Sequence, residues 1–297
     1  MQQAAAAAAG AQHYPAGALY VVATPIGNLA DITLRAIHVL TLVDAVACED
    51  TRHSAPLLRQ LGIEGKALLA VHEHNEREAA ADVLVRLARG ERVAYVSDAG
   101  TPAISDPGAA LVAAAQAAGY RVLPIPGASS AVAALSVAGD ATAGPFTFIG
   151  FLPTRGGDRE RALSALEATS HAQVLFEAPH RIDALAAALA TACGARTVTV
   201  GRELTKQFET VASMPADALP GWFAADANRS RGEFVLVVHA LTAASTEADR
   251  PVFEATLCTL LAALPLKQAV ALTAELSGAP RNAVYERALA LKKSGEG

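Results

Sequence analysis

Two short polar clusters in the first third of the chain carry the side chains best suited to proton transfer. The segment Glu49–His53 reads Glu-Asp-Thr-Arg-His, and the segment His72–Glu76 reads His-Glu-His-Asn-Glu. Carboxylates and imidazoles act as general bases when a hydroxyl group becomes a nucleophile. The candidate bases are Glu49 and Asp50, followed by His53 and His74. The alternative is a structural cluster of ion pairs around Arg52, which the spacing leaves open.

A metal site is the second kind of chemistry that these histidines suggest. His72 and His74 are only two residues apart, and the sequence places no obvious third ligand with them. The cysteines Cys48, Cys193 and Cys258 lie far apart, without the spacing of a metal site or a disulfide pair. We therefore expect no metal, and the unpaired thiols fit a cytoplasmic protein.

The loop that follows residues 93–96 is a candidate ligand site. Those four largely apolar residues predict a short buried strand, and Ser97 and Asp98 place a hydroxyl and a carboxylate at its carboxyl end. Ligands of open α/β sheets bind just outside the carboxyl ends of the strands. Two further polar loops, Thr24–Asn28 and Pro126–Ser130, also follow predicted strands. An ordinary strand-to-helix turn is the alternative for each loop taken alone.

The elements that position these loops alternate along the amino-terminal half. Apolar runs predict strands at residues 19–23, 45–48, 67–71, 93–96 and 121–125, with helical segments between them. Such alternation predicts a parallel, doubly wound sheet. Every polar cluster then falls at the same end of that sheet.

The second half of the chain has fewer helices between its strands. Predicted strands at residues 146–151, 174–177, 197–200 and 234–238 indicate a mixed sheet in a second α/β domain. Helices are expected further on, at residues 252–264, 267–276 and 281–292. The last two are joined by Ser277–Pro280, which has the spacing of a helix-turn-helix. This module could contact nucleic acid, or it could serve packing or dimerisation; the spacing is compatible with both roles.

Length and charge limit the classes of protein that fit. A chain of 297 residues, 52% of them hydrophobic, is long enough for two domains. The net charge of -5 argues against broad coating of nucleic acid but leaves room for a local basic patch. The first residues hold an alanine run without a positively charged start, so we expect no signal peptide, and we expect no transmembrane segment. The predicted parts are a disordered tail at 1–18, α/β domains at 19–142 and 143–241, and a helical module at 250–293.

Eight motifs, taken in order, carry a family resemblance. They are TPIGNLADIT (24–33), ACEDTRHS (47–54), HEHNE (72–76), VSDAGTPAISDPG (96–108), GFLP (150–153), HRI (180–182), GRELTK (201–206) and LPLKQAVALTAELSG (264–278). From about Leu19 onward the chain resembles the ribosomal RNA small subunit methyltransferase I family, of the tetrapyrrole-methylase superfamily. The resemblance implies two α/β domains with S-adenosylmethionine bound between them, in a homodimer. It also implies 2′-O-methylation of a cytidine ribose in the decoding region of 16S rRNA. Because the chain is acidic and has few basic patches, the expected partner is a folded target such as the assembled 30S subunit.

The resemblance also implies which residues bind the cofactor. The cofactor residues are Pro25, Ile26, Asp98, Thr101, Ser129, Ser130, Phe176 and Phe234. The amides and hydroxyls of the two serines, at a predicted helix amino terminus, suit an acceptor such as the cofactor carboxylate. RNA contacts are expected separately, from local cations of this acidic chain: Arg52, Arg155, Arg159, Arg161 and Lys206.

Two other functions remain open at this point. One is methylation of a small tetrapyrrole-like molecule. The helical module and the TPIGN loop disfavour this function. The other is a ribosome-assembly factor that binds the cofactor or RNA without turnover. A Rossmann-type methyltransferase is disfavoured, because the glycine-rich loop of that class is absent.

Overall fold

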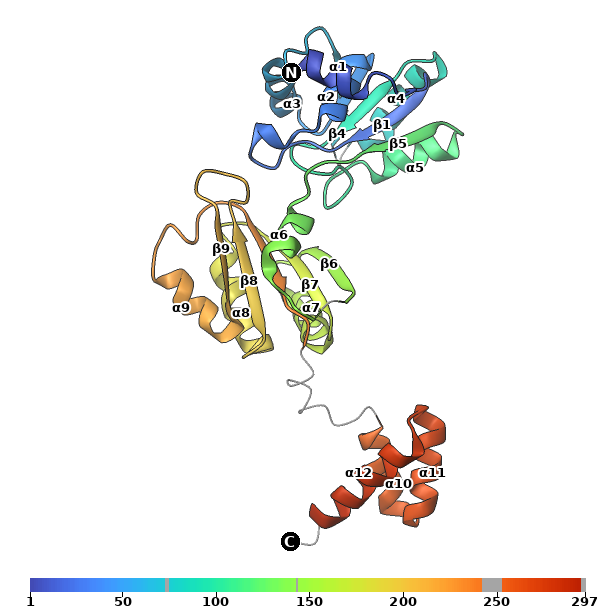
Figure 1. Cartoon of the computed structure of the whole chain (residues 1–297), viewed down its shortest axis with the longest axis vertical. Helices are drawn as coiled ribbons and strands as arrows, with labels where there is room; N and C mark the ends of the chain where they lie inside the picture. The colour runs from blue at the N-terminus through green and yellow to red at the C-terminus, as the bar shows by residue number, and fades with distance from the viewer. Residues whose placement is uncertain (73–74, 143, 242–252, 295–297) are drawn as a thin grey trace. The chain divides into compact units, whose positions relative to one another are not determined.

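The structure is a computed structural model that describes residues 1–72, 75–142, 144–241 and 253–294. The chain forms two compact units, Met1–Ala240 and Leu241–Gly297. The first unit contains two five-stranded sheets, and the described part of the second is helical (Figure 1). The α/β class predicted from the sequence, with one parallel and one mixed sheet, is confirmed. The predicted domain limits stay a prediction, since both sheets belong to one compact unit.

The first sheet is entirely parallel, with the strand order β3-β2-β4-β1-β5. Its strands are β1 (Ala18–Val22), β2 (Ala45–Cys48), β3 (Ala67–Ala70), β4 (Val93–Val96) and β5 (Arg121–Ile125). Side chains alternate between its faces, as they must in a strand: Tyr20 and Val22 enter one core, and Leu19 enters the other. Because the strands are parallel, their carboxyl ends share one edge, as predicted.

Helices cover both faces of this sheet. The first face packs against α1 (Gln2–Ala9), α2 (Leu34–Leu42) and α3 (Thr51–Gln60). The second face packs against α4 (Glu76–Ala88) and α5 (Ala109–Ala117). A short 3₁₀ turn, η1 (Leu29–Asp31), follows β1. This sandwich leaves the carboxyl edge of the sheet to the polar loops.

The amino-terminal segment differs from the prediction of a disordered tail over residues 1–18. Gln2–Ala9 form α1, Ala5 is fully buried, and Tyr14 belongs to the core under the first sheet. Gln2 Nε2 also donates to the carbonyl oxygen of Gly62, 2.5 Å away. Alanine has the highest helix propensity, and its small side chain lets the helix approach α2 closely. The alanine run is therefore a packed helix.

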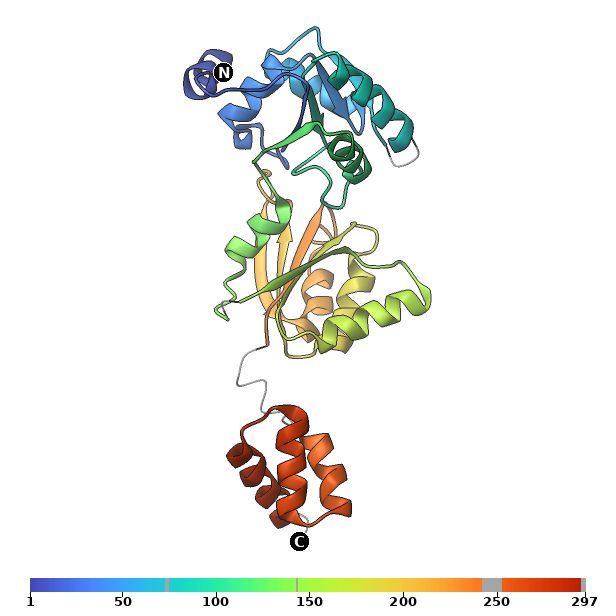
Figure 2. The ribbon, with the colours of Figure 1, turned by 90° about the vertical axis from the view of Figure 1, so that its right-hand side faces the viewer.

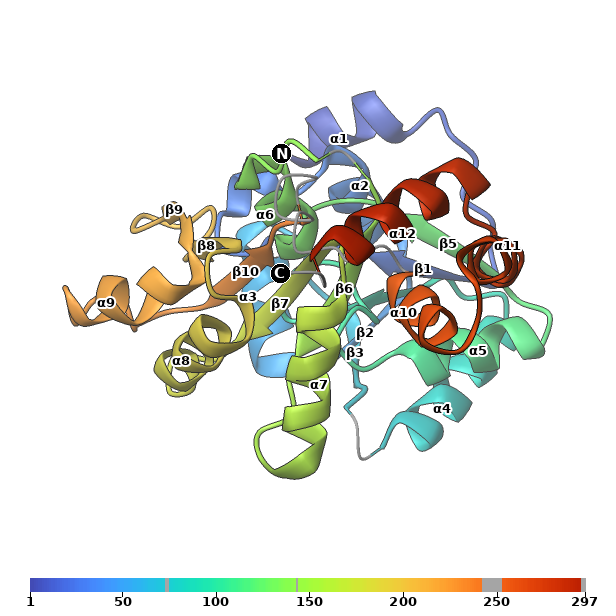
Figure 3. The ribbon, with the colours of Figure 1, turned by 90° about the horizontal axis from the view of Figure 1, so that it is seen from below.

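The second sheet is mixed, with the order β6-β7-β10-β8-β9. Its strands are β6 (Phe146–Phe151), β7 (Ala172–Glu177), β8 (Thr197–Arg202), β9 (Thr210–Pro215) and β10 (Phe234–Val238). β6 and β7 are parallel, and the other three pairings are antiparallel. The covering helices are α6 (Ser130–Ala138), α7 (Gly156–Ala168), α8 (Ile182–Cys193), η2 (Ala216–Ala218) and α9 (Leu219–Ala224). Figure 3 shows α6 on one face of the sheet and α7 and α8 on the other.

The second unit is built from α10 (Glu254–Ala263), α11 (Leu266–Ser277) and α12 (Arg281–Ser294). Figure 2 shows the three helices side by side, around a core that includes Leu257, Val270 and Val284. Gly278 ends α11 in the left-handed conformation that glycine tolerates, at the turn predicted for a helix-turn-helix. Among the described residues, no helix has the length and apolar character needed to cross a membrane.

Candidate functional site

The loops after β1 and β4 are bound to each other at the carboxyl edge of the first sheet. The amide of Thr24 donates to the carbonyl oxygen of Gly100 at 2.9 Å, and the amide of Gly100 donates back at 3.1 Å. The hydroxyl of Thr24 also donates to the carbonyl oxygen of Ser97, 3.2 Å away. Gly100 has φ +79°, which favours glycine, and a Cβ there would lie 3.3 Å from the side chain of Ile26. Two loops far apart in the sequence thus form one rigid wall.

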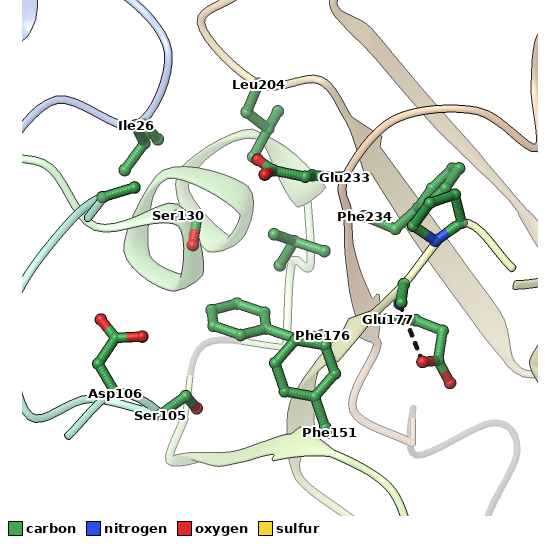
Figure 4. A pocket seen from close by; sticks show the side chains of 14 residues that line it. Ile26, Ser105, Asp106, Ser130, Phe151, Phe176, Glu177, Leu204, Glu233 and Phe234 are labelled. Atoms are coloured by element: carbon green, nitrogen blue, oxygen red, sulfur yellow. Dashed lines mark hydrogen bonds between the residues drawn. The ribbon is translucent and has the colours of Figure 1, made fainter. Parts of the chain in front are cut away.

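An aromatic pocket lies between these loops and the second sheet. The first sheet, its loops and α6 contribute Ile26, Ala99, Ser105, Asp106 and Ser130. The second sheet and its loops contribute Phe151, Phe176, Glu177, Ala178, Pro179, Leu204, Glu233, Phe234 and Val235. Figure 4 shows Phe151 and Phe176 together on one side of this pocket, with Ile26 and Leu204 on the other.

The rings of the aromatic pocket are fixed by contacts with one another. Phe176 packs edge to face against Phe148 and Phe151, with ring centroids 5.0 and 5.8 Å apart. Phe234 also lines the pocket, yet its ring is buried in the opposite core against Phe223. Of the two phenylalanines predicted to bind the cofactor, Phe176 is the one placed to offer its ring.

Glu177 is a pocket residue that the sequence reasoning missed. Its side chain is buried, and Oε1 accepts from the amide of Ala178 and pairs with Nε of Arg181 at 3.0 Å. Oε2 is buried without a hydrogen-bond partner among the described residues. The available signal was a glutamate at a strand end with an arginine four residues later. The side chain of Glu177 is fully buried, so this oxygen does not reach the surface of the pocket.

A second cavity, the histidine pocket, adjoins the aromatic pocket. It is lined by Pro25, Ile26, Gly27, Leu29, His53, Ser54, Leu57, Gln60, Ser97, Asp98, Ala99, Lys206 and Glu233. Ile26, Ala99 and Glu233 line both cavities. A ligand in one pocket therefore lies next to a ligand in the other.

The structure brings Asp98, predicted from the resemblance as a cofactor residue, to the histidine pocket. Its Oδ2 lies 2.7 Å from Nδ1 of His53, and its Oδ1 accepts from the amide of Asp50 at 3.2 Å. The hydrogen bond and the negative charge of Asp98 raise the pKa of His53. An imidazole held by a carboxylate through one ring nitrogen offers the other nitrogen to a ligand.

Two of the predicted bases, Glu49 and Asp50, lie outside the lining of both pockets. Asp50 caps α3 by accepting from the amide of Arg52 at 2.8 Å, and it also pairs with that guanidinium. The hydrogen bonds from Arg52 lower the pKa of Asp50 to about 2. Burial raises the pKa of Glu49, with Asp106 and Asp98 adding to the effect. The fourth candidate, His74, lies outside the described residues.

The remaining predicted cofactor residues lie around the aromatic pocket. Ser130 lines it at the start of α6, and Ser129 is the N-cap of that helix without capping it through its side chain. The hydroxyl of Thr101 donates to the carbonyl oxygen of Ala128 at 3.0 Å, which binds the loop after β4 to the start of α6. Pro25 lines the histidine pocket.

Lys206 is the one lysine or arginine among the described residues that line the two pockets. Its ammonium pairs with Oε1 of Glu203 at 2.9 Å and with Oε2 of Glu233 at 3.0 Å. Its stem covers Gly27, where a Cβ would lie only 2.4 Å from Cγ of the lysine. The loops after β8 and β1 therefore meet through this side chain.

The four predicted arginines do not line either pocket. Arg52 is 86% exposed and paired with Asp50, at the edge of the first sheet. The other three lie at the start of α7, where Arg159 donates to the carbonyl oxygen of Pro153 and Arg161 pairs with Asp158. Arg155 is the N-cap of the same helix.

Backbone strain is concentrated in two loops that face the pockets. Within the described part of the chain, the non-glycine residues with positive φ are Ala103, Ser105, Glu203 and Thr205, with φ from 51° to 68°. Ser105 lines the aromatic pocket, and Glu203 holds Lys206. Such conformations cost energy and are typical of functional sites.

Comparison with known families and solved structures identifies proteins that share this architecture. The family model for Tetrapyrrole (Corrin/Porphyrin) Methylases matches residues 18–220, and the model for the RsmI C-terminal HTH domain matches residues 245–292. The folds of two solved structures are similar: uroporphyrin-III-C-methyltransferase from Thermus thermophilus has a TM-score of 0.54 at 22% identity, and diphthine synthase 0.58 at 17%. Each match covers 75% of this chain. It covers 94% of the uroporphyrin-III-C-methyltransferase chain and 90% of the diphthine synthase chain.

Much greater sequence similarity is found to proteins named ribosomal RNA small subunit methyltransferase I. The protein from Escherichia coli O157:H7 is 45% identical over 274 residues, which is 92% of this chain and 95% of that one. The protein from Pseudomonas aeruginosa is 48% identical over 277 residues, or 92% and 97%. The resemblance carried by the sequence motifs is thereby confirmed. The chain belongs to the tetrapyrrole methylase family, in its branch of ribosomal RNA small subunit methyltransferases I.

Proposed function

We propose that this enzyme methylates the 2′-hydroxyl of a cytidine ribose in the decoding region of 16S rRNA. Methylases of this family take the methyl group from S-adenosylmethionine. The observation that carries the proposal is the pair of adjoining pockets, one aromatic and one polar, which share three lining residues. Two neighbouring cavities suit a reaction in which a donor and an acceptor must meet in line.

The aromatic pocket suits the donor by the chemical character of its lining. Phe176 offers an apolar wall to an adenine, while Ser130 and the free amides at the start of α6 suit a carboxylate. When bound, S-adenosylmethionine supplies a methyl group already activated by the positive sulfur. The task of the protein is then to orient this group and exclude water.

Further cofactor contacts follow the family resemblance. They are assigned to Pro25, Ile26, Asp98, Thr101, Ser129 and Phe234, in addition to Ser130 and Phe176. Ile26 and Phe234 line the aromatic pocket, whereas Pro25 and Asp98 line the histidine pocket next to it. Asp98 is therefore proposed to lie between the bound methyl donor and the bound acceptor.

RNA binding is assigned to local cations, because the net charge of the chain is -5. Lys206 lies in the histidine pocket, and Arg52 lies on the neighbouring α3. Arg155, Arg159 and Arg161 form a second basic group at the start of α7. An acidic enzyme with few cations suits a folded target, which favours the assembled 30S particle over naked rRNA. A homodimer in the cytoplasm completes the proposal.

The test is incubation with methyl-labelled S-adenosylmethionine and 30S subunits from cells that lack this modification. Naked 16S rRNA serves as the second substrate. The expected result is one label on a cytidine ribose in the decoding region, with 30S subunits preferred. Label on a base or in a small molecule would refute the proposal. Cofactor binding without label on any substrate would support an assembly factor instead.

A further inference from the structure

We propose that the histidine pocket receives the ribose of the target nucleotide and that His53, positioned by Asp98, accepts the proton of its hydroxyl. This inference rests on the proposed function and adds to it a proton acceptor and a site for the acceptor nucleoside. It assigns a catalytic role to His53 and a positioning role to Asp98. Three observations support it: His53 is hydrogen-bonded to Asp98, their pocket adjoins the aromatic pocket, and the other nearby carboxylates are paired with other groups or lie outside the histidine pocket.

The pairing leaves one ring nitrogen of His53 available. Nδ1 lies 2.7 Å from Oδ2 of Asp98, so the carboxylate holds a proton on Nδ1, and Nε2 carries the lone pair. The imidazole is 66% exposed in the absence of RNA, which makes it accessible to a large substrate. Asp98 is fixed in turn by the amide of Asp50, at 3.2 Å from Oδ1. The dyad is therefore oriented and still accessible.

The position of the histidine pocket matches that of an acceptor site. It shares Ile26, Ala99 and Glu233 with the aromatic pocket, so a group bound here lies beside the methyl donor. Lys206 is the cation in this pocket; it is paired with Glu203 and Glu233, and a nucleotide phosphate would replace the exposed Glu233 as its partner. Gln60 adds an exposed amide that suits sugar or base edges. These features are those of a nucleotide subsite.

Competing carboxylates are less well placed for the same task. Asp50 is occupied by the α3 amide and by Arg52, and its lowered pKa makes it a weak base. Glu49 lines neither cavity. Glu233 lines both cavities but is paired with Lys206. Asp106 lines only the aromatic pocket, and burial raises its pKa, so it is the strongest rival.

The chemical step balances with these groups alone. The hydroxyl oxygen forms a bond to the methyl carbon while the carbon–sulfur bond breaks, and the electron pair of that bond passes to sulfur. The hydroxyl proton passes to Nε2 of His53, giving an imidazolium next to the Asp98 carboxylate. The proton then leaves to solvent, since the imidazole is exposed in the free enzyme. No other reactant is needed.

The dyad gives the reaction a defined pH dependence. His53 is faced by Asp98 from the loop after β4, by Asp50 and Arg52 from α3, and by Lys206 and Glu233 across the pocket. Asp98 raises the pKa of His53 above its ordinary value of about 6.5. The base form therefore appears only as the pH rises through that raised value. The rate should rise over the same range and fall when the imidazole is protonated.

The experiment measures single-turnover methylation of 30S subunits against pH, for the wild type and for variants. His53→Ala and His53→Gln should lower the plateau rate by roughly a hundred- to ten-thousand-fold, the usual contribution of a general base. In the wild type, the methylation rate rises with pH as His53 loses its proton; this rise is the acid limb of the pH–rate profile. Asp98→Asn should move the midpoint of the acid limb down toward about pH 6.5, because the charge that raises the pKa of His53 is lost. Affinity for S-adenosylhomocysteine, measured by calorimetry, should be unchanged in the His53 variants.

Matched controls separate this inference from the proposed function. His13→Ala removes another exposed histidine and should leave the rate unchanged. Asp106→Asn should keep the acid limb of the wild type. A His53→Ala enzyme with the wild-type rate and profile overturns the role of His53, as does loss of the acid limb in Asp106→Asn. If the wild type itself methylates no RNA ribose, the proposed function fails first.

Discussion

Replacing Lys206 with methionine tests whether the histidine pocket contacts an RNA phosphate. The lysine is held by Glu203 at 2.9 Å and by Glu233 at 3.0 Å, and its stem covers Gly27. Methionine keeps an unbranched stem over the glycine, so the change removes mainly the charge. The pair with Glu233 involves a carboxylate that is 79% exposed. Such exposed pairs contribute at most about 1 kcal/mol. The pair with Glu203 is largely buried, with side chains 28% and 20% exposed, so its loss should also lower the free energy of unfolding, and the folded fraction of the variant is checked by thermal denaturation.

The expected effect on RNA binding follows from counterion release. Each lost phosphate contact lowers the slope of log K against log salt by about 0.7 for a single strand and about 0.9 for a duplex. Between 50 and 200 mM salt, the ratio of wild-type affinity to variant affinity should therefore shrink by roughly three-fold. Lys206→Met should bind less tightly than the wild type at low salt, and the two should converge as salt is raised.

Fluorescence anisotropy with a labelled hairpin of the target helix, or with 30S subunits, measures this over a salt series. Glu233→Gln is the matched control, because it removes a partner of the lysine and keeps the cation. It should preserve or steepen the salt dependence of the wild type. If Lys206→Met shows the slope and affinity of the wild type, the lysine does not bind a phosphate.

Two further predictions concern the loops and the aromatic pocket. Gly108 has φ +118°, and a Cβ there would lie 2.1 Å from the buried ring of Tyr95, so Gly108→Ala should lower the free energy of unfolding by about 2–4 kcal/mol in thermal or urea denaturation. Gly90→Ala, with φ +81° and open space around it, should cost only about 1 kcal/mol, and equal losses would refute the steric argument. Phe176→Ala should weaken binding of S-adenosylhomocysteine by roughly 5- to 150-fold, the usual range for loss of a stacking partner, as measured by calorimetry. Phe146→Ala, at the exposed start of β6, should leave that affinity unchanged, and a similar loss in both variants would count against a direct contact.

The arrangement of the first sheet was predictable because its signals are local. Each strand is a short apolar run, and each polar cluster follows one directly, as in Val93–Asp98. Parallel pairing then brings the clusters to one edge whatever the order of the strands. The predicted edge is the one that carries Thr24, Asp98 and Ser130 in the structure.

Features that depend on long-range packing were not predictable in the same way. The alanine run predicts a disordered tail, because nothing in its own residues shows that it packs against α2. The spacing of 45 residues between His53 and Asp98 gives no sign that they lie 2.7 Å apart. β10 is inserted between β7 and β8, so Glu177 comes to the pocket through a pairing far along the chain. Such pairings follow from the whole fold.

A crystal structure of the full chain with S-adenosylhomocysteine tests the assignment of the two pockets most directly. One molecule is expected in the aromatic pocket, with its adenine or ribose against Phe176 and its carboxylate at Ser130 and the start of α6. Its sulfur should face the histidine pocket, toward Ile26 and Ala99. Density for the ligand on any other surface, or a sulfur directed away from His53, would contradict it.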